Sequence, residues 1–235
     1  MSTQHKDIDF QSSIVSPDAR KSNLSMFMIM MGFTFFSASM WVGQEMARGL
    51  NFTDFIIAMI LGGIILGAYT GALGYIGAKS GLSLDLLAVK TFGTKGSYLP
   101  SAMISFTQMG WFGVGLAMFA IPIAKVAFGD SPLAIYTMVA LAGVCMTATA
   151  YFGIKSLALI SYVAVPCVAI LGTIAMVMAI MQGDKGLVEQ FDLGNKTMGI
   201  VAGAGLVIGS FISGGTATPN FSRFSKNGKV GCLIT

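Results

Sequence analysis

Six long apolar runs dominate this sequence and decide its fold class. They cover about residues 24–44, 55–78, 99–124, 133–154, 157–181 and 198–217. Each run has roughly the 20 residues that a helix needs to cross the hydrocarbon core of a membrane. Strands of a membrane barrel would be about half as long and would alternate polar with apolar residues. The sequence therefore predicts an all-α membrane protein with six transmembrane helices.

The placement of charged residues predicts how the chain lies in the membrane. Charged residues make up only 10% of the chain, whereas soluble domains carry about 25%. With the N-terminus inside, ten of the fourteen Lys and Arg residues fall on inner segments and four on outer ones. This excess predicts a cytoplasmic tail over residues 1–23 and a cytoplasmic segment over residues 218–235. The net charge of +4 reflects this topology, so no nucleic-acid partner is expected.

Two apolar runs are interrupted by glycine and hydroxylated residues. Residues 32–41 read Gly-Phe-Thr-Phe-Phe-Ser-Ala-Ser-Met-Trp, and residues 209–216 read Gly-Ser-Phe-Ile-Ser-Gly-Gly-Thr. A pair of such interruptions is typical of the broken helices that form a transporter's binding site. Close packing between helices also favours Ser and Gly, and it would explain either stretch alone. The occurrence of both stretches favours a binding site.

The six runs contain no Asp, Glu, Lys, Arg or His at mid-membrane depth. A charged residue there is costly and normally marks an ion or proton relay. Its absence argues against a carboxylate relay and against a charged substrate. Without an acid–base pair, a histidine cluster or a phosphate-binding loop, an enzyme is not expected either.

A neutral polar and aromatic pair remains in the third run. Gln108 and Trp111 are three residues apart, so they share one face of a helix. The Gln108 amide suits the donor and acceptor edge of a heterocycle, and a ring stacked on Trp111 gains about 1–3 kcal/mol. Phe211 or Phe36 could cover the other face of the ring. An interhelical hydrogen bond for Gln108 and simple core filling for Trp111 are the alternatives.

Two further features concern the backbone. Unwound carbonyl groups at a helix break can coordinate a small cation, and we place such carbonyls at Gly32 and Phe36. In the second run, Gly63, Gly67 and Gly71 recur at every fourth position. Such a stripe predicts close contact with a neighbouring helix.

Six motifs are long enough to be compared with known families. They are TFFSASMW (34–41), LGYIGAKSGL (73–82), FGTKGSYLPS (92–101), TQMGWFGVGLAMFAIP (107–122), GSFISGGT (209–216) and FSRF (221–224). They resemble the purine/cytosine permeases of the nucleobase–cation symporter family, and the resemblance extends from about residue 15 to the end. It implies a multi-pass importer of cytosine in the bacterial inner membrane, coupled to Na⁺ or H⁺, with lipid around it, no other cofactor and no certain protein partner.

The resemblance also implies a fold and a site. The fold would be the five-plus-five inverted repeat of the leucine-transporter type, of which this chain holds the first repeat and the sixth helix, as a fragment would. Trp111 and Phe211 would sandwich the base, and its polar edge would meet the first helix break and four side chains: Gln108, Ser210, Ser213 and Ser37. Gly32 and Phe36 carbonyls would bind the cation.

Asn220 departs from the family pattern, in which an acidic residue usually precedes the Phe-x-Arg motif. Two alternatives stay open. One is transport of another planar base or of a hydantoin-like ring. The other is a membrane scaffold or regulatory half-protein that does not transport.

Overall fold

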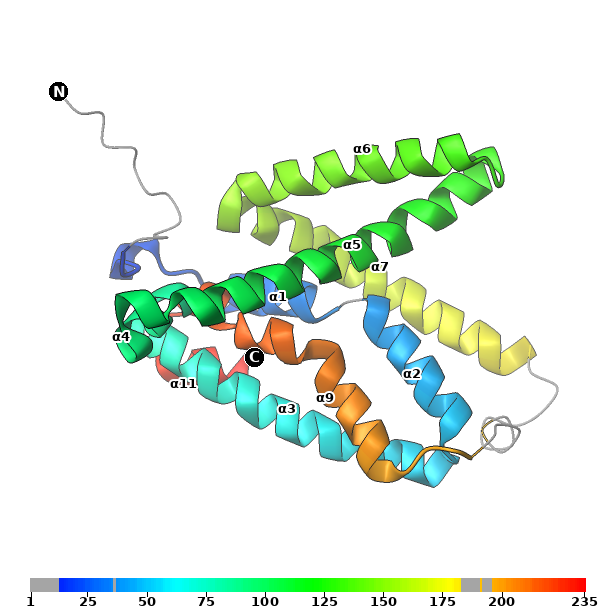
Figure 1. Ribbon diagram of the computed structural model, residues 1–235, viewed down its shortest axis with the longest axis horizontal. Coiled ribbons are helices and arrows are strands. Elements are labelled where there is room, and N and C mark those ends of the chain that lie inside the picture. Colours follow the sequence, from blue (N-terminus) through cyan, green and yellow to red (C-terminus); the bar gives the residue numbers. More distant parts are fainter. Residues whose placement is uncertain (1–12, 36, 183–190, 192–195) are drawn as a thin grey trace.

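The computed structural model describes residues 13–35, 37–182, 191 and 196–235. All regular structure in these residues is helical (Figure 1), so the all-α prediction is confirmed. A 3-10 turn, η1, covers Pro17–Ala19. The α-helices are α1 (Asn23–Thr34), α2 (Ser37–Gly49), α3 (Phe52–Ser80), α4 (Leu84–Gly96), α5 (Tyr98–Phe128), α6 (Pro132–Tyr151), α7 (Gly153–Gln182), α9 (Ile200–Thr216), α10 (Pro219–Ser222) and α11 (Gly228–Leu233).

Within the described residues, four helices are long and apolar enough to cross a membrane, namely α3, α5, α6 and α7. They match the second to fifth apolar runs. A fifth span counts if α1 and α2 are taken together as one broken helix bent by 52°. The sixth run forms α9, which has 17 residues and so lies at the lower limit for a spanning helix. The protein is thus a multi-pass membrane protein, while the inverted repeat stays a prediction.

The interruption predicted in the first run is a true helix break. Helix α1 ends at Thr34, and Phe35 leaves the helical region with φ −73° and ψ 75°. The Phe35 amide still donates to the Met31 carbonyl at 2.9 Å, and α2 begins at Ser37. The chain therefore changes direction inside an apolar run, where backbone polar groups have only protein partners.

The interruption predicted within residues 209–216 is wrong. Helix α9 continues through this stretch to Thr216 and ends because Pro219 cannot donate a backbone hydrogen bond. The ribbon of α9 nevertheless bends along its length (Figure 1). Ser210 Oγ donates to the Val207 carbonyl at 2.7 Å, and both this kind of back-bonding and a Gly-Ser pair bend helices.

Helix α3 is the central packing element, and it contacts α9, α10 and α11. A Cβ on Gly74 would lie 2.5 Å from the Gly231 carbonyl, and one on Gly62 would lie 2.9 Å from the Ala204 carbonyl. By contrast, a Cβ on Gly63 would meet nothing within 4 Å. A Cβ on Gly67 would likewise meet nothing, whereas one on Gly71 would lie 3.3 Å from Cys232 Sγ of α11. The predicted close contact is therefore wrong for Gly63 and Gly67 and confirmed for Gly71.

The N-terminal segment is tied to the residues that follow α10. The Lys21 amide donates to the Phe224 carbonyl at 2.8 Å. Arg20 Nη1 donates to the carbonyls of Ser225 and Lys226 at 3.1 and 2.8 Å. These contacts hold the segment before α1 against the residues that follow α10.

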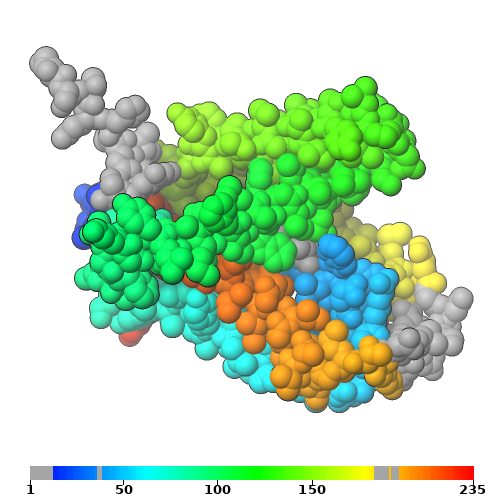
Figure 2. All heavy atoms as spheres, in the orientation of Figure 1, coloured from blue at the N-terminus to red at the C-terminus, as the bar shows by residue number. Residues whose placement is uncertain are grey.

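The helix ends gather at two opposite sides of the molecule. The N-terminal segment, α4 and the α6–α7 junction lie at one end, and the α5–α6 turn and the start of α9 lie at the other (Figure 1). In the space-filling view the α5–α6 pair lies beside a group formed by α2, α3 and α9 (Figure 2). Helix α4 was not predicted, because Asp85, Lys90 and Lys95 exclude a long apolar run there.

Candidate functional site

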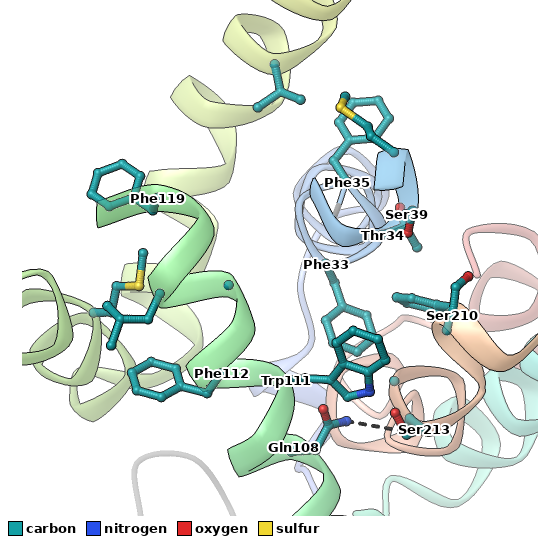
Figure 3. Close-up of a pocket in the computed structure, with 17 residues that line it drawn as sticks. Phe33, Thr34, Phe35, Ser39, Gln108, Trp111, Phe112, Phe119, Ser210 and Ser213 are labelled. Atoms are coloured by element: carbon teal, nitrogen blue, oxygen red, sulfur yellow. Dashed lines mark hydrogen bonds between the residues drawn. The ribbon is translucent and has the colours of Figure 1, made fainter. Parts of the chain in front are cut away.

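A cavity of about 790 Å³ lies where the break between α1 and α2 faces α5 and α9 (Figure 3). Its size is within the usual range for small-molecule sites. None of the lining residues is charged. They are Phe33, Thr34, Phe35, Ser39, Met40, Gln108, Trp111, Phe112, Gly115, Leu116, Phe119, Met146, Val168, Ser210, Phe211, Ser213 and Gly214. The cavity thus suits a ligand without net charge.

Helix α5 supplies Gln108 and Trp111, which lie one turn apart and both line the cavity. Both are half-buried, whereas the intervening Met109 is 59% exposed. Gln108 Nε2 donates to the Ser213 carbonyl of α9 at 3.2 Å, as Figure 3 shows. This bond is the interhelical contact that was one alternative for Gln108, and it also fixes the orientation of the amide. The Oε1 atom is then left as a hydrogen-bond acceptor.

Aromatic rings from three elements meet in the cavity. Phe211 of α9 lies edge-on to Phe33 of α1, with ring centroids 5.3 Å apart and an interplanar angle of 64°. Phe33 also contacts Phe221 of α10, with ring centroids 4.5 Å apart. Trp111 of α5 lines the same cavity as Phe33, and Figure 3 labels both. Trp111 and Phe211 therefore line the same cavity, as the sandwich prediction requires, and Phe33 joins them.

The two predicted serines of α9 differ in what they offer a ligand. Ser210 has its hydroxyl proton directed to the Val207 carbonyl, so towards the cavity it offers lone pairs. Ser213 Oγ has no hydrogen-bond partner among the described residues. It can therefore either donate to a ligand or accept from it.

The remaining predicted residues are less well placed or lie outside the described part. Ser37 begins α2, but its side chain lies outside the described residues, and Phe36 lies outside them altogether. Gly32 does not line the cavity. It lies in the last turn of α1 and packs on α7, where a Cβ would come within 2.5 Å of Ser161 Oγ. Its predicted cation-binding role stays a prediction.

Sequence reasoning missed Phe33 and Ser39 as cavity residues. Both belong to the stretch 32–41 that had been singled out, so the signal was present. Which of its side chains face inward depends on the direction in which the chain turns at the break. That direction is a property of the tertiary structure.

No group of three His, Cys, Asp or Glu residues in the described ranges is arranged to hold a metal.

The fold and the cavity define a class: a multi-pass helical membrane protein with an uncharged cavity beside a helix break. A family model described as "Permease for cytosine/purines, uracil, thiamine, allantoin" matches residues 14–234. The chain is 44% identical over 230 residues to cytosine permeases of Escherichia coli K12, O6:H1 and O157:H7. The match covers 97% of this chain and 54% of each relative, so the chain spans about half the length of these relatives.

The chain belongs to this family of permeases. The family match includes α1 and α2, which flank the helix break, and the α5 segment with Gln108 and Trp111.

Proposed function

We propose that this chain forms the substrate-binding part of a nucleobase transporter, with cytosine as the substrate. The observation that carries the proposal is the uncharged cavity in which Trp111, Phe211 and Gln108 meet beside a break in a helix. Family membership supports transport rather than catalysis. The similar E. coli proteins are cytosine permeases, which favours cytosine over other planar rings.

In the proposed complex the base stacks on Trp111, and Phe211 covers it from the α9 side. A flat ring gains about 1–3 kcal/mol from stacking on an aromatic side chain. The Oε1 atom of Gln108 accepts a hydrogen bond from the amino edge of the base, while one of the two Nε2 hydrogens bonds the Ser213 carbonyl. Ser210 and Ser213 complete the polar edge.

We infer that transport is coupled to a cation, Na⁺ or H⁺. A helix that ends inside an apolar run leaves carbonyl groups without an intrahelical partner, and α1 ends in this way at Thr34. Gly32 and Phe36 carbonyls are the proposed ligands. The proposed location is the bacterial inner membrane with a cytoplasmic N-terminus, which the excess of basic residues on the inner segments supports.

The test combines binding and uptake. Purified protein is titrated with radiolabelled cytosine, and uptake is measured in cells that lack other cytosine transport. Trp111→Ala should weaken cytosine binding about 5- to 150-fold, which corresponds to the loss of one stacking contact. Trp41→Ala is the matched control, because Trp41 is 57% exposed and is not among the cavity residues.

Three outcomes separate the alternatives. Equal binding by both variants would contradict the stacking role. Stronger competition by unlabelled uracil, adenine or hydantoin than by cytosine would identify a different ring as the substrate. Cytosine binding without uptake, together with co-purification of a longer relative, would favour the regulatory half-protein.

A further inference from the structure

Hydroxyl groups inside the apolar helices usually bond to their own backbone. Thr34, Ser161 and Ser210 each donate to a carbonyl three or four residues earlier, at distances of 2.7–3.1 Å. Such a bond satisfies the hydroxyl donor without a ligand and leaves only acceptor capacity free. These three side chains therefore need no further partner in the membrane.

Ser39, like Ser213, is an exception, and in Ser39 the position at the break explains it. It is the third residue of α2, so the carbonyl four residues earlier belongs to Phe35, whose ψ of 75° is not helical. Among the residues that the structure describes, Ser39 Oγ has no hydrogen-bond partner. With respect to these described residues, the hydroxyl is therefore free both to donate and to accept.

The free hydroxyl of Ser39 faces the cavity and not lipid. Ser39 is half-buried and lines the cavity. Figure 3 shows Ser39 apart from the pair formed by Gln108 and Ser213. The cavity therefore offers polar groups in two places, one on α5 and α9 and one at the start of α2.

We propose that Ser39 is a specificity-determining residue that hydrogen-bonds an exocyclic group of the bound base, at a place other than that contacted by Gln108. The proposal rests on the proposed function, since it assumes that a nucleobase occupies the cavity. A pyrimidine such as cytosine carries an exocyclic amine and an exocyclic oxygen on different ring positions. Two separate polar places in the cavity can therefore read two different substituents.

The experiment removes the hydroxyl and one substituent of the base in turn. Wild-type protein and Ser39→Ala are compared by competition against radiolabelled cytosine. The competitors are cytosine, pyrimidin-2-one, which lacks the amine, and 4-aminopyrimidine, which lacks the oxygen. Competitor concentrations are raised until displacement from the wild type is complete. Ser25→Ala is the control, because Ser25 lies on α1 outside the cavity.

Ser39→Ala should weaken cytosine binding about 2- to 12-fold, the range expected for one neutral hydrogen bond. This loss should disappear for at least one of the two analogues, because the partner atom is then missing on both sides. An equal loss of affinity for all three competitors would indicate that Ser39 has only a structural role. No loss of cytosine affinity would show that Ser39 does not contact the base, and either result overturns the proposal. Failure of the wild type to bind cytosine would instead refute the proposed function.

Discussion

Replacement of Gly77 by Ala tests the packing that supports the cavity. A Cβ at this position would clash with Ser222 Oγ and would lie 2.8 Å from Pro219 Cα. Both atoms belong to α10, where Pro219 and Ser222 are fully buried. A backbone atom cannot rotate away as the end of a flexible side chain can, so α10 would have to move as a unit.

The size of the effect follows from a matched pair of variants on the same helix. Overpacking a tight contact costs about 1–3 kcal/mol. Gly67→Ala is the control, because a Cβ there meets nothing within 4 Å. Both variants gain the same helix propensity, about 1 kcal/mol, so the difference between them isolates the clash. At about 2–4 °C per kcal/mol for a chain of this size, Gly77→Ala should melt about 2–12 °C below Gly67→Ala.

The assay heats both detergent-solubilised variants at one rate and measures the protein that stays monodisperse. The double variant Gly77→Ala/Ser222→Ala should recover only part of the loss, because the contact with Pro219 remains. Cytosine binding should weaken in Gly77→Ala as well, since Phe221 of α10 contacts Phe33 of the cavity. Equal melting temperatures for Gly77→Ala and Gly67→Ala would refute this account of the α3–α10 contact.

Two further predictions concern the same end of the molecule and use the same melting assay. Arg20→Ala should destabilise the protein by about 1.5–3 kcal/mol, because two carbonyls lose a charged donor; a melting temperature equal to that of the wild type would argue that water replaces the guanidinium. Asn220→Leu should cost about 1 kcal/mol, because Asn220 Oδ1 accepts from the Leu84 amide at 2.8 Å at the start of α4. Asn220→Asp keeps this acceptor and should melt at or above the wild type; a loss as large as that of Asn220→Leu would contradict the capping role.

Asn220 also shows what a departure from the family pattern can mean. The resemblance led us to expect an acidic residue at this place, and the Asn220 side chain still supplies an acceptor oxygen to the Leu84 amide of α4. The contact is therefore present in this chain.

The length of the apolar runs was enough to predict the main helices, because a segment that crosses a membrane must satisfy its own backbone hydrogen bonds and therefore forms a helix. Helix α4 was missed, since its charges hide it from a search for apolar runs. Ser83 was the available signal, because it caps α4 by accepting from the Leu86 amide at 3.3 Å. The contacting face of α3 was predicted only at Gly71, because the rest of that face depends on α10 and α11, which approach from far along the chain.

The candidate site was predictable where spacing alone decides. Gln108 and Trp111 share a face because they are three residues apart on one helix. The partner of Gln108 was not predictable, since the Ser213 carbonyl reaches it only through the packing of α5 on α9. Interruption of α9 was wrongly expected because Gly and Ser can bend a helix without breaking it, and hydrogen bonding decides between the two outcomes.

The most direct test of the account measures whether cytosine reaches Trp111. The chain has two tryptophans, and only Trp111 lines the cavity, so Trp41→Phe leaves Trp111 as the single reporter and Trp111→Phe leaves the exposed Trp41. Titration of cytosine should quench the fluorescence of Trp41→Phe to saturation and leave that of Trp111→Phe unchanged. Equal quenching of both variants, or no saturable quenching of Trp41→Phe, would contradict the claim that a flat base stacks on Trp111.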